Sequence, residues 1–204
     1  MAYLALIRHG QSEWNLQNRF TGWIDVPLSE KGEEEAQTAA KQLADSGIHF
    51  DKAYTSSLTR AQATLDIILA GINQAGMPVL KDAAINERHY GELQGMDKDE
   101  MRRKYGAEQV HIWRRSYDVR PPKGECLADT ALRALPFYHH HIVPDLTHGK
   151  NVLVAAHGNS LRSIVMELDK LSKEQVVALE IPTGVPIIYE FDKSLKILAK
   201  EILD

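Results

Sequence analysis

Tyr3-Leu4-Ala5-Leu6-Ile7-Arg8-His9-Gly10 is an apolar run that ends in an arginine, a histidine and a glycine. A second run of the same kind, Val152-Leu153-Val154-Ala155-Ala156, ends in His157-Gly158-Asn159. Apolar runs of this length and β-branched content, closed by glycine, are typical of buried strands. Ligands of open α/β sheets bind just beyond the carboxyl ends of the strands. If the two strands are neighbours, the pattern therefore places two imidazoles and an arginine in one crevice.

Predicted strands and helices alternate along most of the chain. We expect strands over residues 3–7, 52–55, 79–80, 152–156, 185–191 and 195–202, and helices over 30–44, 58–75, 127–142, 160–168 and 172–179. Ser29 is the expected N-cap of the first long helix. This alternation favours an α/β fold, specifically a three-layer α/β/α sandwich with a mostly parallel central sheet.

The segment 82–125 breaks this pattern, because it is polar, charged and only weakly periodic. Within it we expect short helices over 97–105 and 107–115, before Pro121-Pro122. Insertions of this kind usually lie over the ligand-binding edge of the sheet. We therefore predict a small inserted cap over the C-terminal strand edge. No repeat or linker is evident, and residues 1–204 are therefore predicted to form one domain.

Composition narrows the class of protein. The 204 residues carry a formal net charge of −4, which argues against a nucleic-acid partner bound through a global positive field. No apolar stretch approaches the ~20 residues of a membrane span, and the N-terminus does not have the pattern of a signal peptide. Cys126 is the only cysteine, so no intramolecular disulfide is expected. We predict a cytoplasmic protein with no membrane partner, in which Cys126 is structural.

His9 is the candidate nucleophile. A neutral imidazole is nucleophilic near neutral pH, since its ordinary pKa is about 6.5. Attack on phosphorus also needs positive charge around the phosphoryl group, which Arg8 and Arg60 are placed to supply. Arg60 falls in the predicted first turn of a helix, where free N–H groups also favour anions. Taken alone, a histidine is more often a structural or surface residue, and Arg60 is equally compatible with an ordinary solvated arginine. It is their combination that indicates chemistry.

Glu87 is the candidate general acid or base for a substrate hydroxyl. The alternative is a structural glutamate that neutralises the arginines, and the sequence leaves open whether its pKa is raised or lowered. Arg114 and Arg115 are adjacent on a predicted helix, so they face different directions. The two readings are contacts with different ligand atoms and a solvated helix face. His139-His140-His141 is not predicted to hold a metal, because consecutive helical side chains diverge by roughly 100°.

These motifs resemble the histidine phosphatase (phosphoglycerate mutase-like) superfamily. The signature is Leu6-Ile7-Arg8-His9-Gly10-Gln11-Ser12-Glu13-Trp14-Asn15. Further segments resemble the cofactor-dependent phosphoglycerate mutases within it: Phe20–Trp23, Asp25–Ser29, Thr55–Ala61, Glu87–Gly91, Trp113–Asp118, Ala156–Arg162 and Ile181–Pro186. The similarity covers nearly the whole chain. The chain resembles a short form, without the segment that longer members insert after the double arginine and without their C-terminal tail.

The resemblance implies a role for each matching position. His9 is expected to be phosphorylated, and Glu87 to donate and accept protons. Arg8, Arg60 and His157 are expected to hold the transferred phosphoryl group, with help from Asn15 and the Gly158 backbone, while Ser12 shapes the site. The substrate's carboxylate and second phosphate are expected to bind Thr21, Gly22, Tyr90, Lys98, Arg114, Arg115 and Asn159.

The resemblance also implies a reaction, the interconversion of 3-phosphoglycerate and 2-phosphoglycerate in glycolysis and gluconeogenesis. It implies small-molecule phosphoglycerates as partners, 2,3-bisphosphoglycerate as the primer that phosphorylates His9, and no metal. It leaves open whether the chain forms a homo-oligomer. The main alternative is a phosphomonoester phosphatase on the same scaffold, and a non-enzymatic phosphate sensor is a third. The cations expected at the substrate end favour the mutase, and the presence of His9 and Glu87 argues against a sensor.

Overall fold

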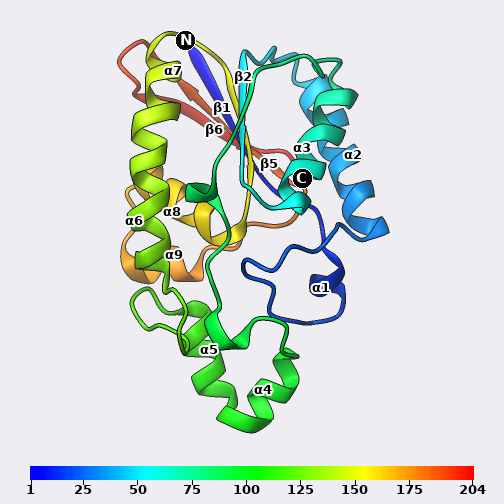
Figure 1. The fold of residues 1–204 in the computed structure, drawn as a ribbon. Helices are drawn as coiled ribbons and strands as arrows, with labels where there is room; N and C mark the ends of the chain where they lie inside the picture. The colour runs from blue at the N-terminus through cyan, green and yellow to red at the C-terminus, as the bar shows by residue number, and fades with distance from the viewer.

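The computed structural model describes all residues, 1–204, and its centre is a mixed six-stranded sheet (Figure 1). The strands are β1 (Ala2–Arg8), β2 (Lys52–Thr55), β3 (Val79–Lys81), β4 (Val152–Ala156), β5 (Pro186–Phe191) and β6 (Ile197–Ile202), in the order β3-β2-β4-β1-β5-β6. The first four strands in that order are parallel, and β5 and β6 are antiparallel additions at one edge.

The two strands that end in histidine are direct neighbours, as predicted. β1 and β4 pair in parallel with Arg8 opposite Ala156, so His9 and His157 leave the sheet side by side. Side chains on a strand alternate between its two faces. Accordingly Leu4 and Leu6 pack in one core cluster, whereas Ala5 and Ile7 pack in the other.

Helices cover both faces of the sheet, which confirms the predicted α/β/α sandwich. Figure 1 shows α2 (Glu30–Asp45) and α3 (Thr59–Gly71) on one face, and α6 (Leu127–Phe137) and α8 (Gly158–Asp169) on the other. The short helices α1 (Glu13–Leu16), α7 (Val143–Thr147) and α9 (Lys173–Ala178) complete the helical layers and loops. No helix is both long and apolar enough to cross a membrane.

The segment between β3 and α6 forms the cap. It contains the 3₁₀ turns η1 (Ala83–Ile85) and η2 (Gly91–Leu93) and the helices α4 (Lys98–Tyr105) and α5 (Ala107–Arg115), the last two close to their predicted positions. The helices α4 and α5 project at one end of the molecule (Figure 1). Met101 of α4 and Val110 of α5 form a small separate core with Phe20, from the loop after α1, and Leu93 of η2.

Three local predictions were wrong. Helix α3 ends at Gly71 rather than near residue 75, because Asn73 adopts a left-handed conformation with φ 57°. The helix expected over 127–142 changes to a π turn at η3 (Tyr138–Ile142), just after Pro136, which has no N–H to donate. The stretch between the predicted strand 3–7 and the predicted helix 30–44, where we expected a loop, contains the short helix α1, whose N-cap is Ser12.

Candidate active site

His9 lies immediately beyond the carboxyl end of β1, and its ring is held in one orientation. The ring nitrogen Nδ1 is 2.6 Å from the carbonyl oxygen of Gly10, which can only accept a hydrogen bond. The proton is therefore on Nδ1, and Nε2 keeps its lone pair. The backbone is fixed as well, since the His9 N–H donates to Ala156 O and the Gly10 N–H donates to Thr64 Oγ1.

The loop after His9 packs directly on the start of α2. A Cβ atom on Gly10 would lie 2.1 Å from the Gly32 carbonyl oxygen, and one on Gly32 would lie 2.0 Å from the Gln11 carbonyl oxygen. Neither position leaves room for a side chain, because the obstructing atoms belong to the backbone. This close approach explains why both residues are glycine, and it fixes the carbonyl that orients His9.

His157 lies beside His9 at the end of β4. The two ring centroids are 4.9 Å apart, with their planes tilted by 60°. Nε2 of His157 forms a hydrogen bond with Ser56 Oγ at 2.7 Å, whereas its Nδ1 is buried and has no partner in the protein. One ring nitrogen of His157 is therefore fixed by the fold, and the other is enclosed without a hydrogen bond.

Arg8 and Arg60 bring positive charge to the same place. Arg8 donates from NH1 to Ile181 O at 2.8 Å, and Arg60 donates from NH2 to Gly22 O at 2.7 Å. The Nε atoms of both arginines are buried without a partner. Burial and the charge of Arg8 lower the pKa of Arg60 to about 10. Because unpaired buried cations are unfavourable, the two guanidiniums form a site that favours an anion.

Burial also keeps the two histidines neutral. It is the main cause that lowers the pKa of His9 well below 6.5, and the charges of His157, Arg60 and Arg8 lower it further. The pKa of His157 is likewise lowered, by burial and then by Arg60 and Arg8. At neutral pH the His9 ring is therefore uncharged and nucleophilic.

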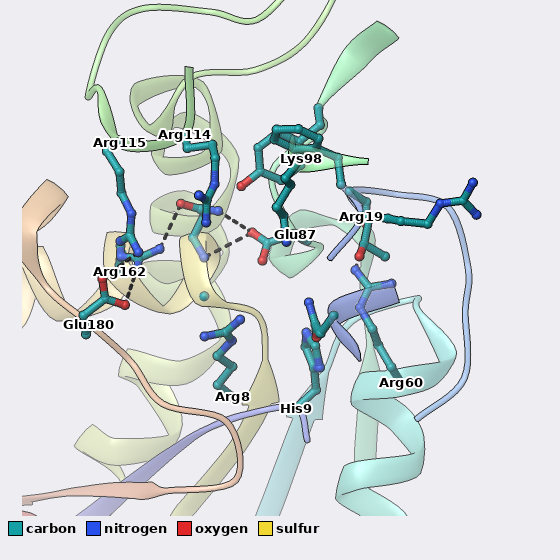
Figure 2. Close-up of a pocket in the computed structure, with 17 residues that line it drawn as sticks. Arg8, His9, Arg19, Arg60, Glu87, Lys98, Arg114, Arg115, Arg162 and Glu180 are labelled. Carbon is teal, nitrogen blue, oxygen red and sulfur yellow. Dashed lines mark hydrogen bonds and ion pairs between the residues drawn. The ribbon is translucent and has the colours of Figure 1, made fainter. Parts of the chain in front are cut away.

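Glu87 lies across the pocket from His9 (Figure 2). Its Oε1 accepts hydrogen bonds from the Arg88 N–H at 2.8 Å, from the Asn159 N–H at 3.1 Å and from Asn159 Nδ2 at 2.8 Å. Burial alone would raise its pKa, but these hydrogen bonds and the charges of Arg8 and Arg60 outweigh burial and lower it. Glu87 is thus ionised and ready to accept a proton.

Arg133 of α6 holds the backbone that carries Glu87. Its guanidinium donates to the carbonyl oxygens of Ala84, Asn86 and Glu87 at 2.8–3.0 Å, and it forms an ion pair with Glu125 at 2.8 Å. Arg133 does not line the pocket. Its part is to position the segment that carries Glu87.

The cap supplies a second group of cations at the far end of the pocket. Lys98 is the first residue of α4, and Arg114 and Arg115 form the last turn of α5 (Figure 2). Burial lowers the pKa of both Lys98 and Arg114, and the charge of Arg114 lowers that of Lys98 further, as the charge of Arg115 does for Arg114. Arg115 NH1 and Thr21 Oγ1 are buried without partners. A second anionic group would satisfy these donors.

The structure brings nearly all the predicted site residues to one pocket. Its lining includes Arg8, His9, Asn15, Thr21, Gly22, Arg60, Glu87, Tyr90, Lys98, Arg114, Arg115, Gly158 and Asn159. His157 is fully buried beside His9 and does not line the pocket. Ser12 is fully buried outside it, where its Oγ donates to Asn15 Oδ1 at 2.9 Å and accepts from the Asn15 N–H.

Sequence reasoning missed four residues of the lining: Arg19, Phe20, Arg162 and Glu180. A signal existed for Arg162, because it follows Asn159 by three positions on a helix and so shares its face. The structure shows the contact, with Arg162 NH1 donating to Asn159 Oδ1 at 3.2 Å. Glu180 lies in the loop after α9, where no periodicity relates it to the site.

Comparisons with known proteins agree with this geometry. Residues 4–200 match the family model described as histidine phosphatase superfamily (branch 1). A Rhizobium rhizogenes protein named 2,3-bisphosphoglycerate-dependent phosphoglycerate mutase is 57% identical over 200 residues, covering 98% of this chain and 95% of that protein. A Bartonella bacilliformis protein of the same name is 54% identical, with coverage of 98% and 97%. A mycobacterial glucosyl-3-phosphoglycerate phosphatase shares the fold, with a TM-score of 0.82, 24% identity and coverage of 99% and 97%.

Proposed function

This chain belongs to the histidine phosphatase superfamily, and within it to the 2,3-bisphosphoglycerate-dependent phosphoglycerate mutases, and we propose that it interconverts 3-phosphoglycerate and 2-phosphoglycerate through phosphorylation of His9, in glycolysis and gluconeogenesis. The observation that carries the proposal is the presence of cations at both ends of one pocket (Figure 2). His9 lies at one end with Arg8 and Arg60, and the cap provides Lys98, Arg114 and Arg115 at the other. A phosphomonoester whose only anion is its phosphate needs only the first group, whereas a phosphoglycerate has a second anionic group for the other.

The pocket suits the 2,3-bisphosphoglycerate that the relatives' name specifies. Buried donors without protein partners occur at both ends, including Arg8 Nε near His9 and Arg115 Nη1 at the cap. When bound, this molecule supplies the phosphoryl group that primes His9. The protein's part is to hold an anion at each end and to keep Nε2 of His9 free for attack.

Glu87 carries the proton in the proposed reaction. When a substrate hydroxyl attacks the phosphoryl group on His9, the P–N bond breaks, a P–O bond forms, and the hydroxyl proton passes to Glu87. In the reverse transfer, Nε2 of His9 attacks phosphorus and Glu87 returns the proton to the departing oxygen. Ionised Glu87 suits the first transfer, and negative charge brought by the substrate would raise its pKa and so favour the second.

A two-stage assay tests the function. Protein is incubated with 3-phosphoglycerate and EDTA, with or without catalytic 2,3-bisphosphoglycerate, and enolase with its magnesium is added only after the protein has been removed. We expect 2-phosphoglycerate to form, to depend on 2,3-bisphosphoglycerate and to be unaffected by EDTA, because the proposed chemistry uses arginine, lysine and histidine charges. Phosphate release faster than 2-phosphoglycerate formation would instead identify a phosphatase, and no turnover at all would leave a binding protein.

A further inference from the structure

Glu180 is the one carboxylate besides Glu87 in the pocket lining. It comes from the loop between α9 and β5, and its side chain is 68% exposed. One of its oxygens lies 2.5 Å from Arg115 NH2 and the other 3.7 Å from Arg162 NH2 (Figure 2). A single acidic side chain therefore spans an arginine of the cap and an arginine of α8.

The backbone on both sides of Glu180 is held by arginines of the site. Arg162 Nε donates to Leu179 O at 2.8 Å, and Arg8 NH1 donates to Ile181 O at 2.8 Å. The Gly184 N–H also donates to Arg8 O at 2.9 Å. The loop is thus fixed to the pocket, whereas the Glu180 side chain is free to rotate toward solvent without moving the backbone.

The two arginines have an unmet requirement for negative charge. Arg162 is 7% exposed, and burial together with the charge of Arg115 lowers its pKa to about 10. Arg115 NH1 is buried without a partner. Glu180 compensates these charges only from the rim, and exposed ion pairs of this kind are weak. A ligand anion with better access can therefore replace it.

We propose that Glu180 is an internal competitor, whose carboxylate occupies Arg115 and Arg162 until the anionic end of a phosphoglycerate displaces it. The proposal rests on the function proposed above, because it requires an anionic ligand that reaches Arg115. Its consequence is that Glu180 weakens retention of the ligand and so favours release. Replacing Glu180 by a neutral residue should tighten binding, whereas removing a residue that merely orients Arg115 should loosen it.

The test compares Glu180→Gln with its parent in a His9→Ala background, so that binding is measured without turnover. Isothermal titration calorimetry with 3-phosphoglycerate should give a dissociation constant about 2- to 5-fold lower in Glu180→Gln. The control is Glu167→Gln, which removes the same charge from an exposed ion pair with Lys170 at the other end of α8. We expect the control to change the constant by less than twofold.

Two results would overturn the proposal. One is a dissociation constant that Glu180→Gln leaves unchanged or lowers no more than Glu167→Gln does. An equal decrease in both variants would mean that only the net charge of the protein matters. The other is weaker binding, which would mean that Glu180 positions Arg115. With His9 intact, Glu180→Gln should lower KM for 3-phosphoglycerate without raising kcat. Circular dichroism of each variant verifies the fold.

The outcome is separable from that of the proposed function. If the wild-type protein has mutase activity but Glu180→Gln does not tighten binding, the function stands and the role of Glu180 is wrong. If the wild-type protein has no mutase activity but Glu180→Gln still tightens phosphoglycerate binding, the competitor role stands and the function is wrong.

Discussion

Asn159 and Glu87 are joined by two hydrogen bonds, one from the Asn159 backbone N–H and one from its side-chain Nδ2, both to the same carboxylate oxygen. The first residue belongs to the start of α8 and the second to the part of the cap that precedes α4. This pairing leaves the other Glu87 oxygen free of both bonds. It also connects the end of β4, where His157 lies, to the proposed proton carrier.

Replacement of His9 by alanine should abolish turnover and leave the fold intact. His9 lies in the ligand pocket, so its removal takes away the nucleophile without opening a core cavity. We expect kcat to fall by at least about 10⁴-fold, as for other enzymes that lose their nucleophile, with the circular dichroism spectrum unchanged. The control is His140→Ala on the exposed surface of the π turn, which should keep full activity. Unfolding of His9→Ala would argue against this assignment.

Replacement of Glu87 by glutamine should separate proton transfer from phosphorylation of His9. The amide oxygen can still accept the bonds from Asn159, but it cannot carry the proton. We expect kcat for mutase turnover to fall by about 10²–10⁴-fold. Phosphorylation of His9 by acetyl phosphate, whose leaving group needs no protonation, should fall much less. Equal losses in both reactions would show that Glu87 is structural.

Replacement of Arg115 by alanine should affect the substrate end of the pocket alone. We expect KM for 3-phosphoglycerate to rise by about 10-fold or more, since a charged hydrogen bond contributes about 1.5–3 kcal/mol. Phosphorylation of His9 by acetyl phosphate should be nearly unchanged, because this donor does not extend to the cap. Arg103→Ala, an exposed arginine of α4, is the matched control. A parallel loss in both reactions would place Arg115 at the phosphoryl end.

Acidification from pH 7 to pH 5 should destabilise the fold through His9 and His157. Both have pKa values lowered below 6.5 in the native state, mainly by burial. Below pH 6.5 the unfolded chain therefore binds protons there that the native chain does not, and unfolding becomes more favourable. The free energy of unfolding should fall by up to about 1.4 kcal/mol per pH unit for each histidine. The free energy of unfolding of His9→Ala, measured with urea at each pH, should change less with pH than that of the wild-type protein. An equal change with pH would contradict this prediction.

The pocket could be anticipated from the sequence because its phosphoryl end depends on short-range patterns. The apolar runs ending in His9 and His157 identify two parallel strands, and parallel strands bring their carboxyl ends to one edge. The prediction was less accurate where tertiary contacts determine where a helix ends or which residues reach the pocket. Ile72 continues the apolar pattern of α3, yet the left-handed Asn73 ends the helix there. Glu180 reaches the pocket only because two arginines hold its loop, and no local signal marks such a contact.

The two ends of the pocket are encoded in different parts of the chain. The phosphoryl end comes from the ends of β1 and β4 and the start of α3, whereas Lys98, Arg114 and Arg115 come from the segment inserted between β3 and α6. Met101 of α4 and Val110 of α5 pack in a small cluster that is separate from the two main cores. Exchange of α4 and α5 alone, which keeps Glu87 in place before them, would therefore alter the substrate end of the pocket without rebuilding the residues around His9.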